Sequence, residues 1–349
     1  MRRTNLQLMK RRVVALSSAA LMAAALTACG SGSSDSSKGA GSKDLTKVSV
    51  GLASPDYQNG DVMLAEKLGY FKKYGLDVDI KLLNGSSSLA AAMKAGSIQI
   101  GEGDGTASAT AILSGIDEVF FGATMKVIPM QMWARKGIDS VSDLRGKKLG
   151  AATPGSLTQI ATTAVLDQAG MTLDDVQLVH LSNPTAKFAA LKSGAIDATL
   201  ANPPGGDQSA SEGTSMIFDA SKIPNMSNGY VTMRKFSESD PEVLLSFLKA
   251  TREAIVDFRN DPAKTKSIVA KYSKQTNPKF QDIGYEFFAP LFTLDPSIEE
   301  SLLTKSFKNA TEAMKKDLSS VDVKSYYYDK AVKQLADEDF VAEMEKKLK

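Results

Sequence analysis

The stretch LAAAMKAGSIQIGEGDG, residues 89–105, is the most informative part of the sequence for the fold of this chain. It predicts the end of a helix, a left-handed glycine cap at Gly96, a short apolar strand and a glycine-rich turn at 101–105. The stretch FAALKSGAIDATLANPPGG, residues 188–206, has the same succession. Three residues recur in order, each 98 positions later: Lys94, Gly96 and Ile98 return as Lys192, Gly194 and Ile196.

The repeat extends upstream, because VGLASP at 50–55 returns as LGAATP at 149–154, offset by 99. A period of this length is too long for a solenoid, so we interpret it as two similar lobes. Each lobe shows strands alternating with helices, which predicts an α/β fold with right-handed crossovers and mostly parallel sheets. In such sheets ligands bind beyond the carboxyl ends of the strands. We therefore expect one ligand cleft between two lobes.

Composition is that of an ordinary globular protein, with 43% hydrophobic and 23% charged residues in 349. The formal charge of +2 includes five cations within residues 1–12. Without them 37 cations face 40 anions, a balance of −3. This balance gives no reason to expect nucleic-acid binding.

Residues 1–28 have a basic start and the apolar core VVALSSAALMAAALTA, too short for a convincing transmembrane span. They end in Leu-Thr-Ala before Cys29, which resembles a bacterial lipobox. The resemblance implies that the leader is cut before Cys29 and that its thiol carries diacylglycerol; the alternative is an ordinary signal peptide with an incidental cysteine. Cys29 is the only cysteine, so one chain can form no disulfide. Residues 29–45 then form a lipidated, flexible Gly/Ser linker, which places the folded body outside the cell membrane.

Four further motifs carry a more specific resemblance. They are AEKLGYFKKYGLDVDI (65–80), AAMKAGSIQIG (91–101), SVSDLRGKKLGAATPGS (140–156) and FAALKSGAIDA (188–198). Together they resemble the substrate-binding proteins of bacterial ABC importers, in the branch for nitrate, taurine, alkanesulfonates and thiamine-pyrimidine precursors. The resemblance implies a two-lobed, type II periplasmic-binding-protein-like fold that closes on a small molecule, as a monomer without cofactor or metal. It also implies an ABC permease and its ATPase as partners.

We expect lobe 1 to contain residues 46–127 and 230–349, and lobe 2 to contain 128–229. From residue 239 onward the sequence is helical, with an Asp-Pro pair opening helices at 240, 261 and 295. The family resemblance implies that these C-terminal helices pack on lobe 1.

In lobe 2, Gly155, Ser156 and Thr158 open a helix whose free N–H groups suit an anion or a carbonyl oxygen. The alternative is that Ser156 only caps the helix. In lobe 1, Glu102 and Asp104 could accept hydrogen bonds from a ligand amine or hydroxyl, or be a solvated turn.

Asn202 occupies the matching place in lobe 2, where many relatives carry an acidic residue. Four first-lobe residues are neutral hydrogen-bonding candidates: Ser54, Tyr57, Ser86 and Ser87. Lys126 is a candidate cation near the crossover, although a surface lysine is the simpler interpretation. For His180 and Trp133 we expect structural roles.

The sequence therefore predicts an extracytoplasmic receptor for a small polar organic molecule, sulfonate-like or pyrimidine-like, and no enzyme. One alternative is an enzyme like the thiamine-pyrimidine synthases of the same superfamily. That chemistry uses histidine and a cysteine-rich motif, and here the only histidine is in a strand and the only cysteine in the lipobox. The other alternative is a sensory or adhesion ectodomain, because a fold alone does not fix a role.

Overall fold

The computed structural model describes residues 45–83, 85–151, 156–181, 184–210 and 213–349, which belong to one compact unit, 43–349. The expected leader, Cys29 and all but the last residue of the linker lie outside the described residues, as does Gly155. Within the described ranges no helix has the length and hydropathy needed to cross a membrane.

Sheet A is built on the first half of the repeat. Its strand order is β2 (Leu76–Leu82), β1 (Thr46–Leu52), β3 (Ile100–Gly103), β10 (Pro224–Met233) and β4 (Glu118–Val127). β1 pairs in parallel with β2 and β3, whereas β10 runs antiparallel to both of its neighbours. The helices between these strands are α1 (Gly60–Lys67), α2 (Tyr70–Lys73), α3 (Ser86–Lys94) and α4 (Gly105–Leu113).

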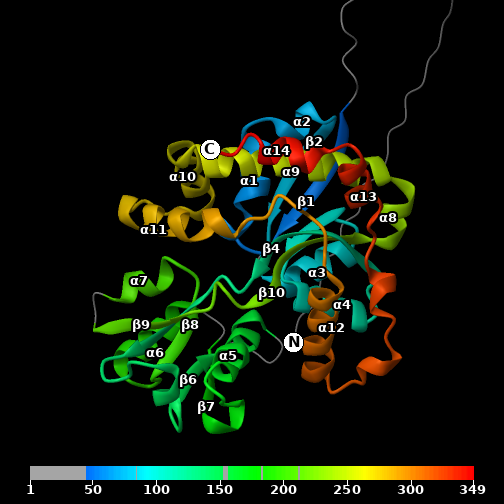
Figure 1. Ribbon diagram of the computed structural model, residues 1–349. Coiled ribbons are helices and arrows are strands. Elements are labelled where there is room, and N and C mark those ends of the chain that lie inside the picture. The colour runs from blue at the N-terminus through cyan, green and yellow to red at the C-terminus, as the bar shows by residue number, and fades with distance from the viewer. Residues whose placement is uncertain (1–44, 84, 152–155, 182–183, 211–212) are drawn as a thin grey trace, which may run out of the picture. The chain divides into compact units, whose positions relative to one another are not determined.

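Sheet B repeats this plan, as its strand order shows: β7 (Gln177–His180), β6 (Lys148–Ala151), β8 (Ala198–Ala201), β5 (Gln131–Arg135) and β9 (Thr214–Asp219). Its helices, drawn with it in Figure 1, are α5 (Leu157–Asp167), α6 (Pro184–Ser193) and α7 (Gly205–Ala210). β6 pairs in parallel with β7 and β8, and β5 runs antiparallel to β8 and β9. We call the parts built on sheets A and B lobe 1 and lobe 2.

The expected two-lobed α/β fold, which is the type II periplasmic-binding-protein fold, is confirmed, but the sheets are mixed rather than mostly parallel. The reason is that each sheet receives a strand that crosses from the other lobe. The chain leaves sheet A after Val127 and returns with β10, which begins at Pro224, before residue 230, where the second segment of lobe 1 was expected to begin. Such a crossing strand enters between a parallel trio and an edge strand, antiparallel to both.

The repeat has a physical cause in two glycines. A Cβ on Gly51 would lie 2.5 Å from Ile98 Cδ1, and a Cβ on Gly150 would lie 2.6 Å from Ile196 Cδ1. An added Cβ at either glycine would therefore displace the isoleucine that precedes the third strand and packs on the first strand. Each preceding helix also ends at a glycine with positive φ, as predicted for Gly96 and its counterpart.

The C-terminal helices are α8 (Arg234–Ser239), α9 (Pro241–Asn260), α10 (Pro262–Ser273), α11 (Pro278–Phe288), α12 (Glu300–Met314), α13 (Lys330–Asp337) and α14 (Phe340–Glu345). α9 packs on α1, α2 and β2, and its apolar face joins the core of lobe 1. Six short 3₁₀ helices complete the described elements: η1 (Tyr57–Asn59), η2 (Val141–Leu144), η3 (Leu173–Asp175), η4 (Ala289–Leu291), η5 (Leu318–Ser320) and η6 (Val323–Tyr326).

Candidate functional site

A cavity of about 740 Å³ is lined by residues of both lobes. Lobe 1 contributes the turn after β1, the start of α3 and the end of β3. Lobe 2 contributes the start of α5, the first turns of α6 and the segment after β8. These places follow the carboxyl ends of the parallel strands, where a ligand is expected in a sheet of this kind. Its volume is that of a pocket for a small organic molecule.

One hydrogen bond crosses the cavity from lobe to lobe. Asn202 Nδ2, after β8, donates to Gln58 Oε1 on η1 over 3.2 Å. Gln58 is itself held firmly, because its Nε2 donates to the backbone oxygen of Ser227 over 2.9 Å and its backbone N–H donates to the Asp56 side chain over 3.0 Å. Asn202 was predicted as a site residue and Gln58 was not. The polar turn that contains Gln58 was the only sequence signal for it.

Asp104 lines the cavity at the point where β3 gives way to α4. Its Oδ1 accepts from the backbone N–H of Ala107 over 2.9 Å, so the residue caps the helix. Burial raises the pKa of Asp104 to about 7, against the opposing effect of the cap bonds. Burial also raises the pKa of Asp56, which lines the same wall. The lobe 1 wall is therefore rich in carboxyl groups.

Lys187 differs from these groups in both lobe and charge. It comes from α6 of lobe 2 and is the one cation among the described lining residues. Only 6% of the residue is exposed. Burial lowers the pKa of its ammonium to about 8. Lys187 was not among the predicted site residues, although the sequence carried a signal for it: it stands four positions before the buried Leu191, on the same face of the helix.

Glu102 does not line the cavity, contrary to the expectation that its carboxylate faces a ligand. It is fully buried in the middle of sheet A, where β10 pairs beside it with Tyr230 opposite Glu102. Its Oε1 accepts from Asn228 Nδ2 over 2.7 Å, and Asn228 does line the cavity. Burial and the neighbouring Asp61 carboxyl raise the pKa of Glu102 well above its usual range. Glu102 thus supports the cavity wall from behind.

A buried polar cluster surrounds Glu102 inside lobe 1. The hydroxyl of Tyr230 donates to Asp61, and Arg252 Nη2 donates to that hydroxyl over 2.9 Å. All three side chains are fully buried. The guanidinium of Arg252 partly offsets the burial that raises the pKa of Asp61.

The other predicted residues divide into two groups. Ser54, Tyr57, Ser86 and Thr158 line the cavity. Ser87 and Ser156 do not; Ser156 caps α5, its Oγ accepting from the N–H of Gln159 over 3.4 Å. Tyr57 already donates its hydroxyl hydrogen to the oxygen of Gln281 over 3.0 Å.

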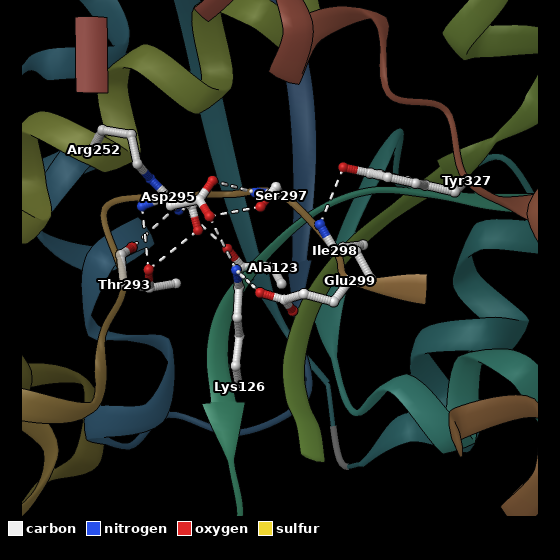
Figure 2. Close-up of polar contacts among 9 residues, drawn as sticks. All are labelled: Ala123, Lys126, Arg252, Thr293, Asp295, Ser297, Ile298, Glu299 and Tyr327. Carbon is white, nitrogen blue, oxygen red and sulfur yellow. Dashed lines mark hydrogen bonds and ion pairs between the residues drawn. The ribbon is translucent and has the colours of Figure 1, made fainter. Parts of the chain in front are cut away.

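Lys126 is also away from the cavity lining. Figure 2 shows its ammonium between Asp295 and Glu299, with Nζ–O distances of 3.3 Å and 3.0 Å. Both acids belong to the segment that runs along β4 after η4. An ion pair that joins β4 to this segment is a structural role, so the simpler interpretation of Lys126 is the better supported one.

Trp133 and His180 are outside the cavity lining as well. Trp133 is buried and packs in a small cluster with Leu191 and Ile196, while His180 ends β7 at an exposed position. In the described part of the chain no group of three or more His, Cys, Asp or Glu residues is placed to hold a metal ion.

Comparison with known proteins shows the family to which this chain belongs. The sequence family described as NMT1/THI5 like matches residues 58–265, which is more than half of the chain and includes most of the cavity lining. The chain belongs to the NMT1/THI5-like family. A binding protein of Brucella abortus (strain 2308) is 28% identical over 247 residues, covering 66% of this chain and 73% of the relative. The taurine-binding periplasmic protein of Escherichia coli (strain K12) is 27% identical over 200 residues, 55% of this chain and 61% of the relative.

Solved structures of similar fold include binding proteins and an enzyme. The periplasmic aliphatic sulphonate binding protein SsuA of Escherichia coli superposes with a TM-score of 0.70 at 20% identity, covering 80% of this chain and 97% of SsuA. The desulfurization enzyme DszB superposes with a TM-score of 0.59 at 13% identity, covering 84% of this chain and 99% of DszB. At these identities the likeness concerns the fold, which this chain shares with both kinds of protein.

Proposed function

We propose that this protein is the extracytoplasmic solute-binding receptor of an ABC importer and that its solute is a small polar organic molecule. The observation that carries the proposal is the cavity between two lobes, which has carboxyl groups on one wall and a buried lysine on the other. A site of this kind encloses a small solute and makes polar contacts with it from both sides. We further propose that the lobes close by bending where the chain crosses between the sheets, at 128–130 and 220–223.

The relatives support the solute class. The two named for a ligand are a taurine-binding and an aliphatic sulphonate binding protein, both periplasmic. Taurine carries an ammonium and a sulfonate, and the cavity offers carboxyl groups for the first and an ammonium for the second. We therefore favour sulfonates over pyrimidines as the solute.

An enzyme is the weaker proposal, even though DszB shares the fold. No cysteine or histidine is among the described residues that line the cavity, so the lining offers neither a thiolate nucleophile nor an imidazole base. A sensory ectodomain would use the same cavity. Genes for a permease and an ATPase beside this one would favour the importer.

Native mass spectrometry tests binding directly. We expect one small molecule per chain to co-purify with the wild-type protein, and we expect Ser86→Trp to lose it. Ser86 lines the cavity, while its neighbour Ser87 is exposed and does not. Ser87→Trp is therefore the matched control and should keep the ligand. Equal occupancy in both variants would place the ligand elsewhere, and release of a chemically altered molecule would show an enzyme.

We also propose that Cys29 anchors the protein by a lipid on the outer face of the cell membrane, where a permease would meet it. Two acyl chains are needed for stable attachment, which a diacylglycerol provides. Metabolic labelling with palmitate should mark the wild-type protein and not Cys29→Ala. The Cys29→Ala protein should also be absent from the membrane fraction as a processed, leaderless form. A labelled Cys29→Ala protein would contradict the anchor.

A further inference from the structure

The lysine in the cavity wall is unusual in having no partner. Lys187 is more than nine-tenths buried, and no hydrogen bond or ion pair joins its ammonium to another described residue. Buried lysines are normally paired, because an ammonium removed from water without compensation is costly. A ligand that supplies the missing anion would remove that cost.

The charged residues around α6 do not supply it. α6 packs against β5, β6, β8 and α7. On β5, Arg135 is paired with Asp197 over 2.5 Å, and on β6 the charged residue is another cation, Lys148. α7 carries Asp207, whose pKa is raised by burial and partly lowered again by Lys279 of α11. β8 consists of Ala198–Ala201 and has no charge.

The two carboxyl groups on the opposite wall do not pair with Lys187 either. Each uses one carboxyl oxygen as a helix cap: Asp104 Oδ1 caps α4 and Asp56 Oδ1 caps η1. They determine what kind of anion fits, however. A doubly charged group such as phosphate would face one lysine and two acids, whereas a singly charged group would be matched by the lysine alone.

We propose that Lys187 is the anion-binding and specificity-determining residue of the cavity, and that its Nζ contacts a singly charged sulfonate or carboxylate of the solute. This inference rests on the proposed solute-binding function. It moves the anion from the start of α5, where the sequence suggested it, to the first turns of α6. It also assigns the two ends of a zwitterionic solute to different lobes, with the anion on lobe 2 and the amine on lobe 1.

The test is calorimetric titration of the full chain with four probes: ethanesulfonate, propionate, taurine and ethanolamine. We expect Lys187→Met to weaken the three probes that carry an anionic group (called the anionic probes below) by about 10- to 100-fold, the usual range for a hydrogen bond to a charged group. Ethanolamine should be unaffected. Lys187→Arg should retain most of the affinity, because it keeps the charge. Lys192→Met, at the exposed end of the same helix, is the matched control and should bind like the wild type.

The outcomes separate this inference from the proposed function. If Lys187→Met binds the anionic probes as tightly as the wild type, the inference is wrong and the receptor proposal stands. If the wild-type chain binds none of the anionic probes, the inference is also wrong. Native mass spectrometry then tests the receptor proposal itself. A neutral or cationic molecule that co-purifies would support the receptor proposal, and a protein without any bound molecule would reject it.

A second measurement does not depend on a variant that removes the lysine. Ethanesulfonate has no group that titrates near neutrality, so its affinity reports on the cavity alone. Loss of the Lys187 proton should lower that affinity above pH 8, by up to about tenfold per pH unit. Ionisation of Asp104 should give a separate, earlier loss near pH 7, because it adds a negative charge that repels the anion. Asp104→Asn should remove the earlier loss and keep the later one. An affinity that stays constant above pH 8 would overturn the inference.

Discussion

The two lobes share a backbone plan and differ in chemistry. Their sheets have corresponding strand orders, and the same glycine–isoleucine contact joins the first strand to the residues before the third. At the end of the third strand lobe 1 has Glu102-Gly103-Asp104, where lobe 2 has Leu200-Ala201-Asn202. Lobe 1 thus presents carboxyl groups and lobe 2 an amide and, from α6, a lysine. The repeat conserves what positions the turns and leaves the turns themselves free to diverge.

The lobes also differ in how they treat buried charge. Lobe 1 contains Asp61, Glu102 and Arg252 in one fully buried cluster. Among the described residues of lobe 2, Lys187 is the buried charged side chain, and it lines the cavity instead of the core. Charge in lobe 1 therefore serves structure as well as binding, whereas in lobe 2 the buried charge is left for the ligand.

Among these variants, we expect the greatest loss of stability from a substitution that disrupts the buried cluster of lobe 1. Arg252→Met removes the donor to Tyr230 and the charge opposite Asp61, so unfolding free energy should fall by about 3–5 kcal/mol, the cost of leaving a buried ion unpaired. Arg135→Met in lobe 2 is the control, because its side chain is 43% exposed in its pair with Asp197. That change should cost at most about 1 kcal/mol. Urea unfolding measures both, and equal losses would refute the contrast between the lobes.

The pH dependence of stability should have opposite signs in the two lobes. The pKa of Asp104 is about 7 when folded, above its unfolded value, so folded protein binds more protons between about pH 4 and 7 and stability falls as pH rises. The pKa of Lys187 is about 8 when folded, below its unfolded value, so its contribution raises stability between about pH 8 and 10.5. Each change is on the order of a few kcal/mol.

Urea unfolding across pH isolates the two groups by difference. Subtracting the curve of Asp104→Asn from that of the wild type should give a fall between about pH 4 and 7, and subtracting Lys187→Met should give a rise between about pH 8 and 10.5. Asparagine retains the capping of α4, so the first subtraction reports the charge and not the cap. Two differences of the same sign would contradict the assignment.

The smallest effect compares the repeated glycines. Gly51→Ala and Gly150→Ala should each cost about 1–3 kcal/mol by overpacking against an isoleucine. Adding Ile196→Val to Gly150→Ala should restore most of that loss. Ile98→Val should restore less in lobe 1, because a Cβ on Gly51 also lies 2.9 Å from Leu89 Cδ1. Full recovery in both lobes, or in neither, would mean that the glycines have another role.

The two-lobed backbone plan could be predicted because the residues that make its repeated contacts recur in the sequence at a fixed spacing. Gly96 and Gly194 both end helices with positive φ, and the isoleucines that follow both pack on a glycine. The sequence could not predict the fate of Glu102, because that depends on β10, which arrives from more than 120 positions later and pairs Tyr230 with Glu102. Glu102, which the sequence placed in an exposed acidic turn, is therefore part of the buried interior of lobe 1.

The wall residues show a second limit. Lys187 lies on the same helix face as the buried Leu191. A lysine at an apolar position of a helix is visible in the sequence, so its burial could have been predicted. Its lack of a partner could not, because that requires the positions of every charge on β5, β6, β8 and α7. Likewise, Gln58 depends on Ser227 and Asn202, which lie on other segments and are joined to it only by the fold.

Closure of the two lobes on one solute can be measured directly. The compact unit 43–349 contains no cysteine, so spin labels can be placed at Ser87→Cys in lobe 1 and Ser193→Cys in lobe 2, both exposed positions. Pulsed electron spin resonance then measures the distance between the lobes with and without the co-purifying molecule. If the lobes close on the solute, the distance distribution should become shorter and narrower when one molecule is bound per chain. An unchanged distribution in protein that mass spectrometry shows to be saturated would contradict it.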